Sequence, residues 1–465
     1  MNEARPFPGR CIVVSPHLDD AILSCYPLIR SYQEQGCLVE LWTVMAGMPH
    51  ANTPFSGLAM KISGYDPFAY VRTRQNEDLK VAESLGIRAI HFYFVDALYR
   101  ADSEERSLYP DIQTLFYQVD LRELHLVNRI SYSLEQELRP GDFLVVPSAI
   151  CGHVDHILTR VACEMLANQK TFYDEFPYTI RSGKALRKDI QRQWGDLIRI
   201  YESQVNLLFP GNSLQYLLSI HQPQLLALPQ IEPRIPRIIH FIWVGDAPLP
   251  PSARKNLDGW ITLLSPRWQI RLWTNSDLTE QAFDSIVLNK IREAPHGIQK
   301  ADILRYHIMS RMGGWYLDLD FEPIQTIEPI ALLLHREDLI LCHEEDCIVN
   351  KISNGFFACT AGHPSIARMA EAVLIQPLNT GVFDMDHIVI HTGPILFKTI
   401  LENVKCVVLP RQLFYPVAFS EMLSGSSINL EASFARHVWH SRYRNRHRGR
   451  HQSQVSHHKL SNSSQ

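Results

Sequence analysis

The sequence has no hydrophobic run long enough to cross a bilayer and no apolar leader near its start. A membrane span needs about 18 to 20 consecutive apolar residues, and the opening segment Met1–Arg10 lacks the apolar core of a secretory signal. Nine cysteines are scattered along the chain without a Cys-x-x-Cys pair. This spacing argues against a disulfide framework and favours reduced, buried thiols, so we expect a cytoplasmic protein.

Acidic residues are missing from the end of the chain. Residues 441–465 hold five Arg, one Lys and almost nothing apolar, which predicts a disordered basic tail over 442–465. Residues 1–440 carry 39 Lys and Arg against 49 Asp and Glu, and a net-acidic body argues against nucleic acid as a partner. The chain is 46% hydrophobic and 20% charged, as globular proteins are. Its 465 residues exceed one typical domain, so several folding units are expected.

The first half alternates short β-branched or aromatic runs with helical periodicity. We predict strands at 11–15, 38–45, 89–95 and 143–147, and helices at 20–34, 71–85, 112–138 and 185–208. Strands that alternate with helices predict parallel βαβ units, and therefore an α/β fold with an open parallel sheet.

A proline-rich segment divides this half from a second strand and helix series. Prolines 223, 229, 233 and 236 break regular structure, so residues 223–236 are predicted to be a linker between domains at 1–222 and 237–441. The second series is also α/β. Its predicted strands are 237–244, 269–273 and 315–321, and its predicted helices are 251–263 and 297–312.

Two clusters of histidine and aspartate follow predicted strands of the first domain. His17, Asp19 and Asp20 follow the first strand, and Gly152–His156 (Gly-His-Val-Asp-His) follows the strand at 143–147. Ligands bind at the carboxyl ends of the strands of an open α/β sheet, so both clusters can lie at one edge. Together they offer His, Asp and His ligands with an open fourth position, which is typical of a catalytic zinc site. Each cluster alone also fits a helix start capped by Asp.

These residues resemble the LmbE-like, PIG-L family of zinc-dependent N-acetylglucosaminyl deacetylases, which implies a Rossmann-like fold. Arg74–Gly86 (Arg-x-x-Glu-Asp-x-x-x-Ala-x-x-Leu-Gly) and Tyr201–Gln204 support the resemblance, which covers about the first 215 residues. It implies zinc on His17, Asp20 and His156, Asp19 as general base, and His153 as oxyanion partner or general acid, oriented by Asp155.

The second domain contains Gly313-Gly-Trp-Tyr-Leu-Asp318-Leu-Asp320 after the helical segment Lys300–Tyr306. Two aspartates at the end of one strand project to the same side of the sheet and suit a hard divalent ion that also binds phosphate. The combination resembles the DXD-containing glycosyltransferases of the OCH1-like group over about residues 234–441. That resemblance implies a GT-A fold, a nucleotide-diphosphate sugar donor, Mn²⁺ or Mg²⁺ on Asp320, and Asp318 at the ribose and metal.

Four further residues of this domain take roles from the resemblance. Asp302 and Arg305 would hold hydroxyls of the donor sugar, Trp243 would stack on the base, and His440 would add a metal or diphosphate contact. Each also has a structural interpretation: Asp302 and Arg305 fit a helical ion pair, and Trp243 fits a core position. Residues 391–394 (His-Thr-Gly-Pro) are either a wall of the site or a turn.

We therefore expect a bifunctional enzyme. One half would transfer a sugar from a nucleotide donor to a small-molecule, lipid or glycan acceptor, and N-acetylglucosamine is the sugar we expect first. The other half would remove the acetyl group from that sugar. Two alternatives remain open: a transferase with a non-catalytic first domain, or a deacylase acting on an unrelated N-acyl substrate. The sequence indicates neither the acceptor nor the oligomeric state.

Overall fold

The computed structural model describes residues 9–51, 54–181, 186–264, 266–345, 351–417 and 430–438. The chain divides into two compact units, Met1–Ile231 and Glu232–Gln465. The division falls inside the segment interpreted as a linker. The predicted tail at 442–465 lies outside the described residues.

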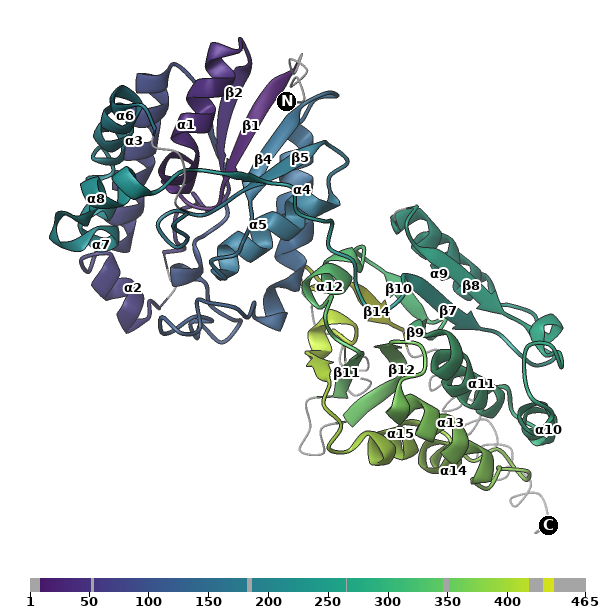
Figure 1. Ribbon diagram of the computed structural model, residues 1–465. Coiled ribbons are helices and arrows are strands. Elements are labelled where there is room, and N and C mark those ends of the chain that lie inside the picture. Colours follow the sequence, from purple (N-terminus) through teal and green to yellow (C-terminus); the bar gives the residue numbers. More distant parts are fainter. Residues whose placement is uncertain are drawn as a thin grey trace, which may run out of the picture. The chain divides into compact units, whose positions relative to one another are not determined.

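A six-stranded sheet forms the centre of the first unit (Figure 1). Its strands are β1 (Arg10–Ser15), β2 (Leu38–Thr43), β3 (Arg88–His91), β4 (Phe143–Pro147), β5 (Lys170–Tyr173) and β6 (Leu225–Leu226), in the spatial order β3-β2-β1-β4-β5-β6. The first five are parallel, and β6 is antiparallel to β5. The predicted open, mainly parallel sheet is confirmed. Its strand order reverses between β1 and β4, and such a reversal opens a crevice at the carboxyl ends of these strands.

Helices cover both faces of this sheet. They are α1 (Asp20–Glu34), α2 (Gly57–Ile62), α3 (Pro67–Leu85), α4 (Leu124–Glu137), α5 (Val154–Met165), α6 (Lys188–Ile198), α7 (Glu202–Leu208) and α8 (Ser213–Ile220). One core joins α1, α3, α6 and α8 to the strands through buried side chains such as Ile22, Val81 and Trp194. Helices α4 and α5 pack against each other on the opposite face (Figure 1).

Three elements of the first unit differ from the predictions. The predicted helix at 112–138 starts only at Leu124, because residues 111–123 form turns and a short 3-10 helix. The predicted helix at 185–208 is broken into α6 and α7. The break buries Tyr201, whose hydroxyl donates to Asp78 Oδ1 at 2.7 Å. Strand β6 lies within the predicted linker, because Leu225 and Leu226 extend the edge of the sheet beside β5.

The second unit is built on a mixed six-stranded sheet with the order β13-β11-β12-β9-β7-β8. Its strands are β7 (Ile238–Ile242), β8 (Gln269–Trp273), β9 (Gly314–Leu317), β11 (Leu339–Glu345), β12 (Lys351–Cys359) and β13 (Val407–Leu409), and a separate ribbon pairs β10 (Phe321–Pro323) with β14 (Ala435–His437). Strands β7, β8 and β9 are parallel, whereas β12 is antiparallel to β9 and β11. The predicted α/β class is confirmed for both units.

The helices of the second unit are α9 (Pro251–Leu263), α10 (Ser285–Glu293), α11 (Gly297–Met312), α12 (Glu328–Leu333), α13 (Pro364–Ile375), α14 (Met385–His391) and α15 (Pro394–Leu401). Helices α10, α11, α13 and α15 share one core with the sheet. The predicted strand at 315–321 is wrong in one respect: β9 ends at Leu317, and Asp318–Asp320 form a turn before β10. The chain turns there because β10 leaves the main sheet to pair with β14.

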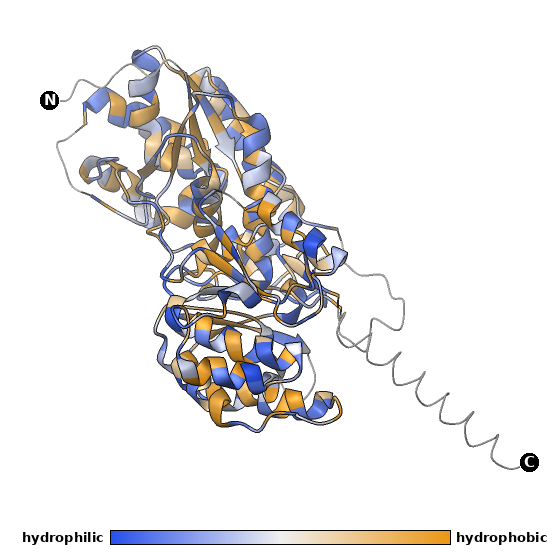
Figure 2. Cartoon of the chain, turned by 90° about the vertical axis from the view of Figure 1, so that its right-hand side faces the viewer, coloured by the Kyte–Doolittle hydropathy of each residue, from blue (hydrophilic) through white to orange (hydrophobic). Residues whose placement is uncertain are grey.

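No helix among the described residues combines the length and hydrophobicity needed to cross a membrane. The helices carry hydrophilic and hydrophobic residues side by side (Figure 2). This pattern is typical of helices that pack one face against a sheet.

Candidate functional site

The first cluster lies in the loop that joins β1 to α1. Asp19 occupies the position just before the helix, yet its side chain makes no capping hydrogen bond. Its carboxylate instead accepts a hydrogen bond from Arg74 Nη2 at 3.2 Å. The interpretation of Asp19 as a simple helix cap is therefore wrong, and its carboxylate faces the interior of the site.

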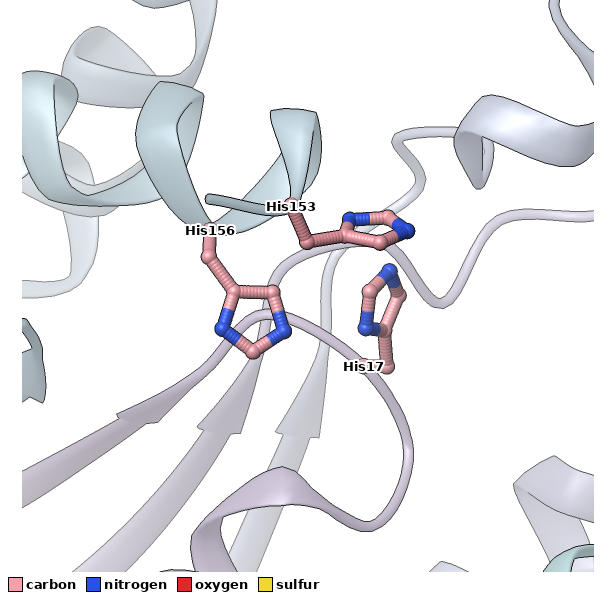
Figure 3. A group of neighbouring side chains, drawn as sticks. All are labelled: His17, His153 and His156. Atoms are coloured by element: carbon pink, nitrogen blue, oxygen red, sulfur yellow. The ribbon is translucent and has the colours of Figure 1, made fainter. Parts of the chain in front are cut away.

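The second cluster reaches the same edge of the sheet because β4 lies beside β1. His153 precedes α5, and His156 lies in its first turn. The rings of His17, His153 and His156 face one another (Figure 3). Their ring centres are 4.8 Å apart for His17 and His153, 5.2 Å for His17 and His156, and 5.5 Å for His153 and His156.

Asp20 joins two of these imidazoles. Its Oδ2 atom lies 3.0 Å from His17 Nδ1 and 3.2 Å from His156 Nε2. His156 Nε2 is buried, and its contact with Asp20 does not have the angles of a regular hydrogen bond. Two imidazole nitrogens and one carboxylate oxygen that converge in this way fit the donor set of a zinc site.

The neighbouring carboxylates of Asp19 and Asp20 have pKa values that are shifted in opposite directions. Burial raises the pKa of Asp19 to about 6, against the opposing charge of Arg74. Burial acts in the same direction on Asp20, but the charges of His156 and His17 outweigh it and hold the pKa of Asp20 well below its ordinary value. Asp20 thus stays ionised between the two imidazoles, whereas burial opposes the ionisation of Asp19.

His153 is held as a neutral ring. Burial and the nearby charge of His17 lower its pKa well below the ordinary value. The backbone N–H of Asp155 donates to His153 Nδ1 at 3.2 Å, so the single proton of the neutral ring belongs on Nε2. His153 can therefore donate a hydrogen bond to a substrate oxygen.

The carboxylate of Asp155 contacts His17 and Arg100. Its Oδ2 atom lies 3.1 Å from His17 Nε2 and accepts the Ala97 N–H at 2.9 Å, and its Oδ1 atom accepts from Arg100 Nη1 at 2.5 Å. Asp155 thus orients His17 through its side chain and contacts His153 only through its backbone. The expected orientation of His153 by Asp155 is consistent with this backbone hydrogen bond.

Sequence reasoning gave no role to two residues beside His17. Asp96 Oδ2 lies 3.8 Å from His17 Nε2 and 3.6 Å from Arg74 Nη1. Arg74 is the first residue of the motif Arg74–Gly86, for which the sequence predicted no function. Asp96 follows the predicted strand at 89–95, so the strand-end rule that found His17 could also have found it.

The second unit brings Asp318 and Asp320 together with His437. One ligand atom from each lies within 4.8 Å of the others, and His437 Nε2 is 2.9 Å from Asp320 Oδ1. Pairing of β10 with β14 sets His437 opposite Phe321 and so beside Asp320. Sequence reasoning chose His440, which lies outside the described residues, and missed His437 three positions earlier.

Asp302 and Arg305 belong to the same constellation. Arg305 Nη2 lies 3.0 Å from Asp302 Oδ1, and Arg305 Nη1 lies 3.3 Å from Asp318 Oδ1. The helical ion pair is therefore present and also reaches the Asp-x-Asp turn. Thr392 donates its hydroxyl proton to Asp302 Oδ2 at 2.9 Å, which attaches the His-Thr-Gly-Pro segment to the site. Burial raises the pKa of Asp302 to about 6, against the charge of Arg305.

Trp243 lies at the same edge of the second sheet, just beyond β7. Because β7 is parallel to β9, its carboxyl end adjoins the turn that carries Asp318. The half-buried indole donates its N–H to Ala247 O at 2.8 Å. Its predicted contact with a nucleotide base stays a prediction.

Residues 12–166 match the family described as GlcNAc-PI de-N-acetylase, and residues 250–337 match the glycosyltransferase sugar-binding region containing a DXD motif. The chain is 28% identical over 183 residues to 2'-N-acetylparomamine deacetylase of Niallia circulans, covering 36% of this chain and 66% of that protein. It is 27% identical over 143 residues to inositol phosphoceramide mannosyltransferase 3 of Schizosaccharomyces pombe, covering 29% of this chain and 36% of that protein. The chain thus spans from about a third to just under two thirds of these relatives.

Among solved structures, a deacetylase from the biosynthesis pathway of teicoplanin is 26% identical, with a TM-score of 0.39 over 45% of this chain and 89% of that one. The two family matches fall in different units, as the two resemblances predicted. The first unit thus contains a region that matches the PIG-L deacetylase family, and the second unit contains a region that matches the DXD-containing glycosyltransferases.

Proposed function

We propose that the chain is a bifunctional sugar-modifying enzyme. Its second domain would transfer a sugar, N-acetylglucosamine in the first instance, from a nucleotide-diphosphate donor, and its first domain would remove the N-acetyl group in a zinc-dependent reaction. The observation that carries the proposal is Asp20 Oδ2, which lies between His17 Nδ1 at 3.0 Å and His156 Nε2 at 3.2 Å. A first domain that served only as a scaffold would not need this ligand set.

In the deacetylase, zinc would be held by His17, Asp20 and His156. Bound zinc polarises a carbonyl and lowers the pKa of water to about 7. Asp19 would take the proton from the attacking water and later deliver it to the departing amine, because its buried carboxylate adjoins the ligand Asp20 without being a ligand itself. His153, with its proton on Nε2, would donate a hydrogen bond to the oxygen of the substrate amide. Of the two roles considered for His153, its neutral state favours the oxyanion partner.

In the transferase, Asp318, Asp320 and His437 would hold Mn²⁺ or Mg²⁺ against the donor diphosphate. The carboxylate oxygens of Asp318 and Asp320 suit these ions, which complete their shell with phosphate oxygens, and His437 would add one nitrogen ligand. Asp302 and Arg305, which are buried and bonded to each other, would bind hydroxyls of the donor sugar. Trp243 would stack on the base.

A second substrate class has a specific observation in its favour. The relative from Niallia circulans is named for the deacetylation of 2'-N-acetylparomamine, so the first domain could act on the N-acetyl group of another small molecule rather than on the product of the second domain. We place the enzyme in the cytoplasm, since the eight cysteines of the described segments are free thiols. We also propose that residues 1–222 and 237–441 are separate domains.

Mass spectrometry tests the proposed function. The purified chain is incubated with nucleotide-diphosphate sugars and simple acceptors, with and without a chelator. A mass gain of one N-acetylhexosamine followed by loss of one acetyl group, both suppressed by the chelator, supports the bifunctional enzyme. Transfer without any deacetylation, in a chain that holds less than about 0.2 zinc per molecule, would support a scaffold instead.

A further inference from the structure

A fully buried carboxylate lies behind each of the two histidines proposed to bind zinc. Asp155 Oδ2 lies 3.1 Å from His17 Nε2, and Glu175 Oε1 lies 3.4 Å from His156 Nδ1. In both rings the other nitrogen faces Asp20. Each imidazole therefore extends from Asp20 to a carboxylate on its far side. The role of Asp155 follows from its contact with His17, whereas Glu175 has no role so far.

Glu175 is held rigidly by the strand next to it. It lies two residues beyond β5, and the end of β5 pairs with the end of β4 through Tyr173 and Pro147. The residues that follow β4 therefore meet the Glu175 side chain. Ser148 donates its hydroxyl proton to Oε2 at 2.6 Å, and the backbone N–H of Ala149 donates to Oε1. Both oxygens are fixed, so the carboxylate stays directed at His156.

We propose that Glu175 is a positioning residue of the zinc centre, which accepts the Nδ1 proton of His156 and so presents the unprotonated Nε2 toward Asp20. The inference rests on the proposed zinc-dependent deacetylation. A neutral imidazole has one proton, and an acceptor at Nδ1 decides which nitrogen keeps it. A carboxylate behind a metal-binding histidine also makes the ring a stronger ligand, and its removal typically costs about 10- to 100-fold in metal affinity.

The same side chains allow a rival arrangement. One atom each from Cys151, His156 and Glu175 lie within 4.8 Å of one another, so Glu175 could bind a metal directly together with the thiol. Direct binding would require the Cys151 thiolate as a ligand. The Cys151 side chain also interacts with His156, and a serine hydroxyl keeps a polar partner at this position while it replaces the thiol. The variant Cys151→Ser therefore distinguishes the two arrangements.

The test is the zinc dissociation constant of the full chain, measured by competition with a chelator. Glu175→Gln keeps the shape of the side chain but removes its charge, and it should weaken zinc binding about 10- to 100-fold. Glu164→Gln is the matched control, because Glu164 is also buried but faces Arg160 at 3.7 Å. Glu164→Gln and Cys151→Ser should bind zinc as the wild type does. Excess zinc should restore deacetylation by Glu175→Gln, which it would not do for a packing defect.

A second variant covers the case in which Glu175→Gln does not fold. Ser148→Ala keeps the carboxylate and removes one of its anchors, so zinc binding should weaken by less than in Glu175→Gln. Wild-type zinc affinity in both variants would overturn the inference, and so would loss of zinc binding in Cys151→Ser. A wild-type chain that binds no zinc would instead refute the proposed deacetylase itself.

Discussion

Asp19 and Asp20 are neighbours in the chain but differ in what surrounds them. Asp20 lies between two imidazoles, and Asp19 lies against Arg74. We expect Asp19→Asn to keep zinc and to lose about 10²- to 10⁴-fold in deacetylation rate, because the change removes a general base without removing a ligand. Metal analysis and a deacetylation assay check this. Asp20→Asn is the comparison and should lose zinc, and zinc loss in Asp19→Asn would make Asp19 a ligand instead.

Gly355 shows how closely the second site is packed. A Cβ atom at this position would lie 2.6 Å from Asp318 Oδ2 and 3.1 Å from the Tyr415 hydroxyl. Gly355→Ala should therefore displace the Asp318 carboxylate and lower sugar transfer at least 10-fold, while deacetylation stays unchanged. Gly381→Ala is the control in the same unit, since nothing lies within 4 Å of its added Cβ. Equal transfer rates in the two variants would show that Asp318 tolerates the shift.

At the scale of single elements, β7 carries a histidine that links pH to stability. His240 Nδ1 accepts the indole N–H of Trp273 at 3.1 Å, and His240 Nε2 lies 3.0 Å from Gly313 O. This arrangement needs a neutral ring. Burial lowers the pKa of His240 to about 4, so between pH 6.5 and 4 the folded chain binds fewer protons than the unfolded chain.

The contribution of His240 to the free energy of unfolding should therefore fall as the pH falls from 6.5 to 4, by up to about 3 kcal/mol, whereas the raised pKa values of Asp19 and Asp302 act in the opposite direction. His307, whose pKa burial also lowers to about 4, acts in the same direction as His240. Urea unfolding of the wild type and of His240→Asn at pH 7, 5.5 and 4.5 isolates this contribution as the difference between the two chains. His240→Asn, which cannot take up the proton, should show a smaller decline over this range. An unchanged slope in that variant would contradict the argument.

The sequence predicts a helix or strand well where the local residue pattern determines its limits. It predicts the limits less well where contacts with residues far along the chain determine them. The strands that end at Ser15 and Pro147 are short apolar runs, and the strand-end rule was enough to join His17 with His156. The break before Tyr201 depends on Asp78, which lies 123 positions away. The turn at Asp318–Asp320 depends on β14, more than a hundred residues further along the chain. Local periodicity in the sequence does not indicate contacts between residues so far apart. For the same reason, the sequence analysis did not assign His437 and Glu175 to the two sites.

At the scale of the whole molecule, each unit has its own sheet and core. The core of the first unit is drawn from residues between Cys11 and Leu218, and that of the second from residues between Ile242 and Leu401. The histidine and aspartate site lies in the first unit, and the Asp-x-Asp site lies in the second. Among the described residues, the two sites share no ligand residue.

Asp320→Ala should accordingly abolish sugar transfer and donor hydrolysis while it leaves zinc content and deacetylation of a preformed N-acetylglucosaminide intact. Mutations at sites that share no partner residue usually couple by no more than about 0.5 kcal/mol. Calorimetry with a nucleoside diphosphate and Mn²⁺ should show loss of binding, because the ion depends on both the carboxylate and phosphate oxygens. Asp258→Ala, which changes an exposed carboxylate of the same unit, is the control. Undiminished transfer in Asp320→Ala would remove the Asp-x-Asp turn from the mechanism, and a parallel loss of deacetylation would mean that the two sites are not independent.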